Sequence, residues 1–190
     1  MLDPIFGIAI ATLWLSWLIY WWVSARSVKA NRWREPLGSQ LLHRVPLMLA
    51  AILLGAPGWL PAPLTRRFLP PGPLVPALGV ALLAAGLGFS VWARRHLGEN
   101  WSSHVAVKED HALIRSGPYG HLRHPIYTGL LLAFAGTGLA IGEWRAVLAL
   151  PLALVAFAWK SRREEQQMRR LFPEYERYRR ETAALIPFVY

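Results

Sequence analysis

Five long stretches without charged side chains constrain this chain more than any other feature of its sequence. They are residues 4–25, 45–64, 68–93, 125–142 and 146–159. A helix that crosses a bilayer needs about 20 predominantly apolar residues, and the first three stretches meet that length. The last two are shorter and only a few residues separate them. They predict a tight helical hairpin that spans thinly or lies partly inside a bundle.

The composition agrees with a membrane protein rather than with a soluble or a disordered chain. Hydrophobic residues make up 54% of the sequence and charged residues 17%, against about 25% charged in a typical soluble domain. We therefore expect an all-α fold, a polytopic membrane helix bundle of about five transmembrane helices with a cytoplasmic loop and amphipathic C-terminal helices. Residues 1–95 would hold the first three helices, and residues 96–190 the loop, the hairpin and the C-terminal helices.

The basic residues are distributed so unevenly that they predict an orientation. The formal net charge of +10 would permit a nucleic-acid partner, but the apolar stretches are too contiguous for a soluble basic domain. If five helices cross the membrane, 18 of the 21 lysines and arginines lie on one side, and Arg66, Arg67 and Arg145 on the other. Because basic loops stay in the cytoplasm, we expect a multi-pass protein, of the cytoplasmic membrane, with lipids as neighbours and no nucleic acid. The first stretch follows no basic segment, so we expect it to be retained rather than cleaved.

Polar side chains concentrate first in the segment that joins the third and fourth apolar stretches. Gly117 and Pro118 predict a turn, and Pro125 suits the first position of the next helix. Arg123 and His124 would then precede a helix N-terminus, where free N–H groups and the helix dipole favour an anion. Interfacial anchoring and capping are the alternative role for this pair.

The first turns of the helix that Pro125 begins, and the residues just before it, are candidates for ligand binding. Tyr127 and Gly129 fall there, and a glycine lets a ligand or another backbone come close. His121 and His124 are three residues apart, but the following proline makes their segment non-helical and no acidic cluster lies nearby. The chain also has no cysteine, so we expect no metal site. The sequence contains neither a GxGxxG nor a P-loop motif.

The second concentration of polar residues follows the fifth apolar stretch. Lys160, Arg162, Glu164 and Glu165 occur together, and the adjacent glutamates point about 100° apart on a helix, so at least one can face the bundle. Apolar and aromatic residues then recur at helical spacing, which is typical of an amphipathic tail on a membrane, and Pro173 predicts the start of a second short helix. Ordinary ion pairing on the tail surface is the alternative for the glutamates.

These two concentrations together resemble the isoprenylcysteine carboxyl methyltransferase family, which is related to the phospholipid methyltransferases. The family pattern is Gly-x-Tyr, then Arg-His-Pro-x-Tyr-x-Gly, a later Glu-Glu, an aromatic tail and a closing proline. The matching residues are Gly117, Tyr119, Arg123, His124, Pro125, Tyr127, Gly129, Glu164, Glu165, Phe172, Tyr175, Tyr178 and Pro187. The resemblance covers about residues 95–188, roughly half of the chain.

The resemblance implies an integral membrane methyltransferase that uses S-adenosylmethionine and takes a lipophilic small-molecule substrate from the bilayer, with its active site facing the cytoplasm. By this resemblance, the cofactor-binding residues are His111, Leu113, Gly117, Tyr119, His124, Pro125, Tyr127, Gly129 and Glu164. The residues expected to act on the substrate are Arg123, Lys160, Arg162 and Glu165.

The acceptor implied by the resemblance is a carboxylate of the isoprenylcysteine type, but one position departs from the pattern. Carboxyl-methylating members place an arginine five residues before the second glutamate, where this chain has Lys160. Because lysine cannot hold a carboxylate bidentately, a lipid amine or a thiol stays open as the acceptor. Either would need a base such as Glu165 or a histidine. An NADPH-dependent enzyme similar to sterol reductases and a non-enzymatic membrane scaffold are further alternatives.

Overall fold

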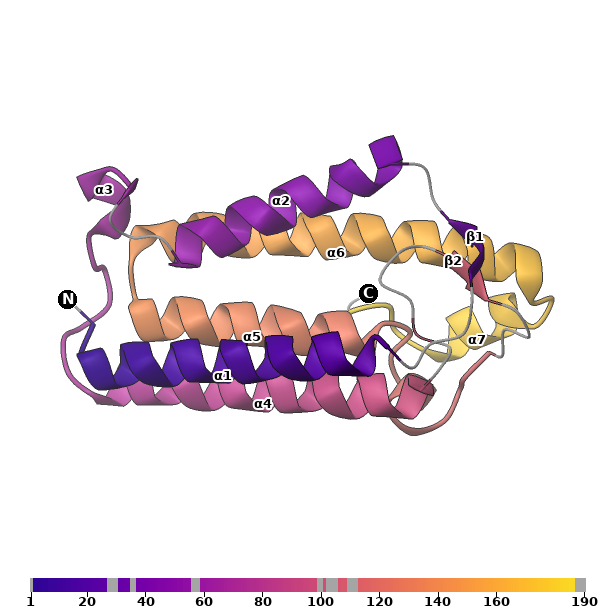
Figure 1. Ribbon diagram of the computed structural model, residues 1–190, viewed down its shortest axis with the longest axis horizontal. Helices are drawn as coiled ribbons and strands as arrows, with labels where there is room; N and C mark the ends of the chain where they lie inside the picture. Colours follow the sequence, from indigo (N-terminus) through magenta and orange to yellow (C-terminus); the bar gives the residue numbers. More distant parts are fainter. Residues whose placement is uncertain are drawn as a thin grey trace.

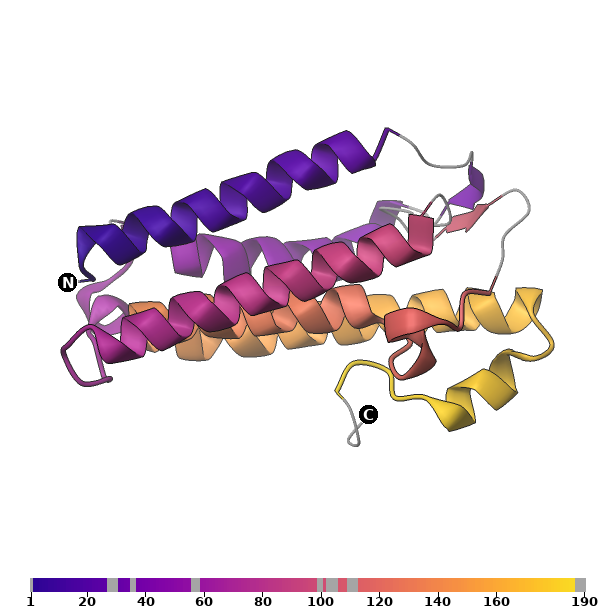
Figure 2. The same cartoon turned by 90° about the horizontal axis from the view of Figure 1, so that it is seen from below.

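Five long helices run side by side in the computed structural model, which describes residues 2–26, 31–34, 37–55, 59–98, 101, 106–108 and 113–186 (Figure 1). They are α1 (Pro4–Ser24), α2 (Leu37–Gly55), α4 (Leu74–Leu97), α5 (Pro125–Ile141) and α6 (Trp144–Leu171). The shorter helices are α3 (Ala62–Thr65), the 3-10 helix η3 (Gly117–Gly120) and α7 (Tyr175–Glu181). Two strands, β1 (Asn31–Arg34) and β2 (Ala106–Lys108), pair antiparallel at the end of the bundle that also carries α7 (Figure 2).

The predicted all-α membrane bundle is confirmed, with one addition. Four helices, α1, α2, α4 and α6, contain stretches long and apolar enough to cross a membrane. The fifth, α5, has 17 residues; at 1.5 Å per residue it is about 25 Å long, against a hydrocarbon core of about 30 Å. The β1–β2 pair, which the sequence did not indicate, ties the loop after α1 to the loop after α4.

Helices α5 and α6 form the predicted hairpin. Gly142 caps α5 with a φ of 64°, the left-handed conformation in which glycine commonly ends a helix. Arg67 Nη1 donates to Ile141 O at 2.6 Å. Arg145 forms an ion pair with Glu143 at 2.7 Å and donates to two carbonyl groups in the last turn of α2. Two arginines thus satisfy helix-end carbonyls at the end of the bundle opposite α7.

Glycines let α4 and α5 pack with their backbones almost in contact. A Cβ atom on Gly129 would lie 2.6 Å from Gly86 O and 2.7 Å from Ser90 N. A Cβ atom on Gly136 would collide with the backbone nitrogen of Leu83. Small residues at such crossings allow close van der Waals packing, which is what holds membrane helices together. The close fit fixes the depth of α5 against α4, and therefore the position of the loop that precedes α5.

Helix α1 is the least embedded of the long helices. None of its residues is buried, and Ile5 and Trp22 are among several large apolar side chains that it exposes. Such a surface suits lipid rather than water. Trp14 Nε1 donates to Thr137 Oγ1 of α5 at 3.1 Å. One turn later, Trp17 Nε1 donates to Ser90 Oγ of α4. Arg94 of α4 also donates to the carbonyl of Ser24, the last residue of α1, at 2.7 Å. Three polar contacts therefore attach α1 to the bundle along its length.

The C-terminal tail folds back onto the start of α5. Helix α7 follows Pro173, which confirms the predicted second short helix. Beyond α7, the backbone N–H groups of Arg123 and His124 donate to the carbonyls of Ala183 and Ala184 at 2.8 and 3.1 Å. The tail is therefore part of the structure around the first turn of α5.

Candidate functional site

Charged and aromatic side chains from α5 and α6 meet at the end of the bundle that carries α7. Because a proline begins α5, Arg123 and His124 lie directly before its first turn, and Tyr127 lies within it. Helix α6 runs antiparallel to α5 and has 28 residues, so it extends past the start of α5. We call the resulting group the polar cluster: Arg123, His124, Tyr127, Lys160, Glu164 and Glu165.

The Arg123 guanidinium is bound on several sides by protein atoms. Its Nε donates to Glu165 Oε1 at 2.7 Å. Its Nη1 donates to the carbonyl of Arg179 at 3.0 Å and to the carbonyl of Thr182. The side chains of Arg123 and Glu165 are only 8% and 12% exposed. Arg123 therefore links the start of α5 to α6 and to the C-terminal tail.

The His124 imidazole lies between the two glutamates. Its Nδ1 is 3.3 Å from Glu164 Oε2, and its Nε2 is 3.3 Å from Glu165 Oε1. Burial disfavours the charged ring, but the hydrogen bonds and charges of both glutamates outweigh burial and raise the pKa of His124 above its ordinary value. A protonated imidazole donates from both nitrogens, as this geometry requires.

The Tyr127 ring connects the polar cluster to the apolar interior. Its hydroxyl donates to Glu164 Oε1 at 2.6 Å. The ring stacks on His124 with a centroid distance of 5.5 Å and on Phe157 with a centroid distance of 5.1 Å. Lys160 Nζ lies 5.2 Å from the ring centroid, within the range of a cation–π contact. One aromatic residue thus faces both a carboxylate and the buried core.

The loop before α5 packs against α4 and α7. Gly117 has a φ of 58°, and a side chain at this position would strike the ring of His96 on α4. Tyr119 is buried, and its carbonyl accepts a hydrogen bond from the Tyr178 hydroxyl at 2.7 Å. Burial raises the pKa of the Tyr119 phenol and raises that of Tyr178 to about 12. Both phenols therefore stay neutral and act here through packing and hydrogen bonding.

Several residues expected from the resemblance lie outside the polar cluster. Arg162 is exposed on α6 and Leu113 is half-buried in the loop. Gly129 faces the backbone of α4, so the close approach that its sequence position suggested is made by another helix. His111 and Pro187 fall outside the residues that the structure describes.

Other residues that the structure places at the cluster carry no distinctive sequence motif. Arg179 Nε is 3.5 Å from Glu165 Oε2, and Arg179 and Thr182 also supply the carbonyls that Arg123 binds. A backbone carbonyl gives no signal in residue type, so only the position of these residues after the aromatic tail could have indicated them. Pro125, in contrast, is fully buried at the start of α5, as a helix-initiating proline allows.

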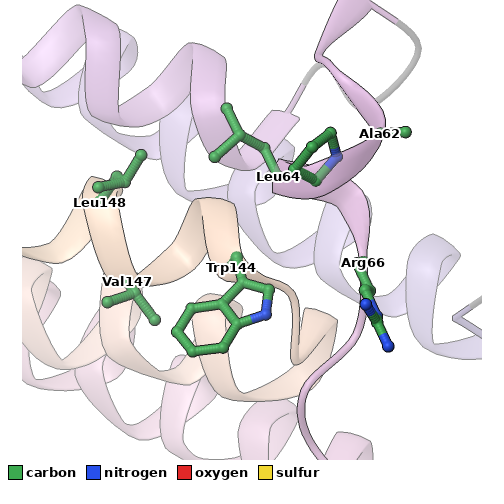
Figure 3. Close-up of a pocket in the computed structure, with 7 residues that line it drawn as sticks. Ala62, Leu64, Arg66, Trp144, Val147 and Leu148 are labelled. Carbon is green, nitrogen blue, oxygen red and sulfur yellow. The ribbon is translucent and has the colours of Figure 1, made fainter.

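Two large cavities are lined mainly by apolar side chains. One, of about 660 Å³, lies at the opposite end of the bundle between α3 and the start of α6, with Trp144 and Leu148 on α6 and Arg66 at its edge (Figure 3). The other, of about 650 Å³, lies among α1, α2, α5 and α6 and extends to Phe157. Only the second of these two cavities approaches the polar cluster.

The fold and the polar cluster define a membrane helix bundle whose charged end is built from the loop before α5, the end of α6 and the tail. The sequence model of the phospholipid methyltransferase family matches residues 74–175, which include the whole polar cluster. The chain belongs to this family. The resemblance drawn from the motifs is thereby confirmed.

Individual relatives agree with this membership. The chain is 31% identical to the cobalt-zinc-cadmium resistance protein CzcN of Cupriavidus metallidurans, over 75% of this chain and 60% of that protein. It is 32% identical to the protein-S-isoprenylcysteine O-methyltransferase of Schizosaccharomyces pombe, over 60% of this chain and 49% of that protein. The matched region therefore spans about half to three fifths of the length of these relatives.

A solved structure shares the fold. It is that of the eukaryotic intramembrane Ras methyltransferase ICMT (isoprenylcysteine carboxyl methyltransferase), with a TM-score of 0.52 and 20% sequence identity. The similarity covers 80% of this chain and 50% of the other. Together with the apolar helices, this likeness identifies the chain as a membrane protein.

Proposed function

We propose that the chain is an integral membrane methyltransferase that uses S-adenosylmethionine and methylates a lipophilic acceptor of the isoprenylcysteine-carboxylate type. The observation that carries this proposal is the polar cluster, in which two carboxylates and several cations gather at one end of an apolar bundle. Family membership supports the reaction class. Relatives in two yeasts that are named protein-S-isoprenylcysteine O-methyltransferase support the acceptor class.

The donor set of the cluster fits the charges of S-adenosylmethionine. Glu164 and Glu165 suit an ammonium group and ribose hydroxyls, and the face of Tyr127 suits a sulfonium. The sequence favours an anion at the N-terminus of α5, where the cofactor carboxylate would fit, but the backbone N–H groups just before this helix already donate to tail carbonyls. Arg179, which lies at the edge of the cluster beside Glu165, is therefore the partner that we assign to that carboxylate.

The protein contributes positioning rather than bond-making chemistry. S-adenosylmethionine, when bound, supplies a methyl group that is already activated. Arg123 and His124 hold both glutamates through the contacts described above, so these carboxylates are oriented in advance. We assign Arg123 the part of a positioning residue, because its described contacts are with Glu165 and with backbone carbonyls.

The protonation of the cluster favours an acceptor that needs no base. A carboxylate is methylated without losing a proton, whereas an amine or a thiol must be deprotonated. His124 is a poor base near neutral pH because its pKa is raised, and Glu165 is held in ion pairs with Arg123 and Arg179. Lys160 is the cation that we assign to orient an acceptor carboxylate.

The distribution of charge supports a cytoplasmic active site in the cytoplasmic membrane. The loops on the side predicted to be basic lie at the same end of the bundle as the polar cluster (Figure 1). Basic loops are retained in the cytoplasm, which is also where S-adenosylmethionine is made available. The cluster draws all its members from residues 96–190, which we propose as the catalytic region, with residues 1–95 as its membrane support.

The proposal is tested by methyl transfer with the purified full chain in lipid nanodiscs. Methyl-labelled S-adenosylmethionine is supplied with membrane lipids or with prenylcysteine analogues, and we expect label in a base-labile methyl ester of the analogue. Label in an amine or a thioether would instead establish one of the alternative acceptors. Absence of transfer to any acceptor, together with absence of S-adenosylhomocysteine binding, would contradict the proposal and favour the scaffold.

Binding measurements separate the remaining alternatives. In calorimetric titrations we expect S-adenosylhomocysteine to bind and NADPH not to bind, whereas a reductase would show the reverse. Glu164→Gln should weaken S-adenosylhomocysteine binding about tenfold or more, because a charge-assisted hydrogen bond is lost. Glu174→Gln is the matched control, since Glu174 is exposed at the start of α7.

A further inference from the structure

The cavity between α3 and the start of α6 has the size of a ligand site and lies at the surface of the bundle. Its volume is about 660 Å³, within the range of roughly 300–1,000 Å³ that is usual for such sites. Three α6 side chains that line it, Trp144, Val147 and Leu148, are 48%, 43% and 49% exposed. Large apolar side chains that are exposed together indicate a surface that another apolar molecule covers.

The cavity lies where α6 enters the apolar part of the bundle. The helix begins at Trp144, and Val147 and Leu148 follow one turn deeper, at the start of the apolar stretch 146–159. Tryptophan at the end of a membrane-spanning helix is typical of the level of the lipid head groups. A molecule in this cavity therefore has one end among head groups and the other among hydrocarbon chains. This is how a phospholipid lies in the leaflet opposite the polar cluster.

Arg66 supplies a positive charge at the edge of the cavity. Its backbone carbonyl accepts a hydrogen bond from the Trp144 N–H at 3.3 Å, which fixes Arg66 beside the start of α6. The residue is exposed, and no group among the residues that the structure describes bonds its guanidinium. In the view of Figure 3, Arg66 lies on the side of the Trp144 ring that carries the indole nitrogen, and Val147 and Leu148 lie on the other side.

The other described charges at this end of the bundle already have partners. Arg67 donates to a carbonyl at the end of α5, and Arg145 is paired with Glu143 at 2.7 Å. The Asp3 carboxylate accepts a hydrogen bond from the first turn of α1 at 2.9 Å. Of these side chains, only that of Arg66 is open to a ligand, and its charge favours an anion. A head group that carries an ammonium group meets only carboxylates that are already bonded.

We propose that this cavity binds an anionic phospholipid of the leaflet opposite the polar cluster, with its phosphate at Arg66 and one acyl chain against Val147 and Leu148. A guanidinium can bond two oxygens of a phosphate at once, and the Trp144 indole N–H is a further donor. Because an ammonium group finds no free carboxylate, the favoured head group has no amine, as in phosphatidylglycerol. The bound lipid would fasten α3 to the α5–α6 hairpin, since the cavity lies between them.

Two valines of α6 provide a matched test of the apolar half of the site. Val147 and Val155 are 43% and 58% exposed, but Val147 lines the cavity and Val155 is not among its lining residues. Val147→Trp should fill part of the cavity, whereas Val155→Trp should place its ring in the surrounding lipid. Neither residue belongs to the polar cluster, so both variants should bind S-adenosylhomocysteine as the unsubstituted protein does.

Two arginines provide a matched test of the charged half. Arg66→Gln removes the charge at the cavity, whereas Arg177→Gln removes a charge at the other end of the bundle, where the side chain is 75% exposed. An arginine near a membrane surface contributes about a fivefold preference for anionic lipid. Arg66→Gln should abolish that preference at the cavity, and Arg177→Gln should leave it unchanged there.

The experiment uses the full chain in phosphatidylcholine nanodiscs that contain a minor fraction of a photoreactive lipid. The probes are phosphatidylglycerol and phosphatidylcholine with the same acyl chains, one of which carries a diazirine near the glycerol. We expect the phosphatidylglycerol probe to label the peptide that contains residues 144–148 about fivefold more than the phosphatidylcholine probe does. The excess should disappear in Arg66→Gln and Val147→Trp and persist in Arg177→Gln and Val155→Trp.

A second measurement follows the effect of the lipid on stability. A ligand that binds only the folded protein raises its unfolding midpoint, so phosphatidylglycerol should raise the midpoint of the unsubstituted protein more than that of Arg66→Gln. Equal labelling by the two probes, or a preference that survives in Arg66→Gln, would overturn the inference. Crosslinks between two copies of the chain through the 144–148 peptide would also overturn it, because a second copy would then cover the cavity.

Discussion

The Arg123 guanidinium and the Glu165 carboxylate form a 2.7 Å ion pair across 42 residues of sequence. The same guanidinium binds two carbonyls of the C-terminal region. One side chain therefore joins the loop before α5, the end of α6 and the tail. The arginine of the Arg-His-Pro motif therefore has a structural role that does not depend on contact with a substrate.

Loss of this ion pair should destabilise the whole charged end. Arg123→Ala leaves Glu165 largely buried without its closest cation, and breaking a buried pair in this way costs about 3 kcal/mol or more. The ten tryptophans allow thermal unfolding in detergent to be followed by intrinsic fluorescence. We expect the unfolding midpoint to fall by roughly 5–10 °C.

An exposed ion pair supplies the control for this variant. Arg177 pairs with Glu181 one turn away, but its side chain is 75% exposed, and such surface pairs add little stability. Arg177→Ala should unfold at the same temperature as the unsubstituted protein. If Arg123→Ala also unfolded at the temperature of the unsubstituted protein, the Arg123–Glu165 ion pair would not stabilise the charged end.

The Tyr127 hydroxyl should matter more for cofactor binding than for folding. Tyr127→Phe keeps both ring stacks but removes the 2.6 Å hydrogen bond to Glu164. A hydrogen bond to a charged group contributes roughly 1.5–3 kcal/mol, so S-adenosylhomocysteine should bind about tenfold more weakly or worse. Calorimetry measures this, with Tyr175→Phe as the control in a neighbouring buried tyrosine. Equal loss of affinity in the two variants would argue against a specific role for Tyr127.

The sequence predicted the architecture because its signals are local. Apolar length marks each long helix, Pro125 and Pro173 mark helix starts, and Gly142 marks the hairpin turn. The charged motif before α5 and the Glu-Glu pair on α6 were also visible, since they are unusual residues beside apolar stretches. Their meeting in space follows from the antiparallel hairpin, which the sequence also indicated.

What escaped prediction depends on tertiary contacts. At Gly129 the sequence predicts the close approach of a ligand or of another backbone without deciding between them, and the distances to Gly86 and Ser90 show that it is the backbone of α4. The carbonyls of Arg179 and Thr182 bind Arg123 through backbone atoms, which no residue type reveals. The β1–β2 pairing joins two loops that are far apart in sequence, so neither segment alone signals it.

Packing at Gly129 gives a prediction that separates a structural from a ligand-binding role. Gly129→Ala places a Cβ atom against the α4 backbone, and overpacking of this kind typically costs about 1–3 kcal/mol. Gly88→Ala is the control on α4, because nothing lies within 4 Å of the added atom. We expect a lower unfolding midpoint for Gly129→Ala alone. Unchanged stability with weakened S-adenosylhomocysteine binding would instead indicate contact with the ligand.

The stability that His124 contributes should decrease as pH rises. Burial opposes the charged imidazole, but the two glutamates outweigh it, so the pKa of His124 is higher in the folded protein than the ordinary value of about 6.5. Its contribution is therefore complete below about pH 6.5 and disappears as the pH passes through the raised pKa. The difference in unfolding midpoint between the unsubstituted protein and His124→Gln should be largest in mildly acidic buffer and shrink in alkaline buffer. A difference that grows with pH would contradict this assignment.

The absence of cysteine makes the membrane topology directly testable by single-cysteine labelling. Trp59 and Trp144 are 90% and 48% exposed at the end of the bundle opposite α7, and Glu174 is exposed beside α7. In spheroplasts of a bacterial expression host, an impermeant maleimide should label Trp59→Cys and Trp144→Cys. It should label Glu174→Cys only in inverted vesicles, because basic segments stay in the cytoplasm. The Trp144→Cys variant tests whether the hairpin crosses the membrane. If Trp59→Cys were labelled from outside and Trp144→Cys were not, α5 and α6 would enter the bilayer without crossing it. The 17-residue length of α5 would be the physical reason.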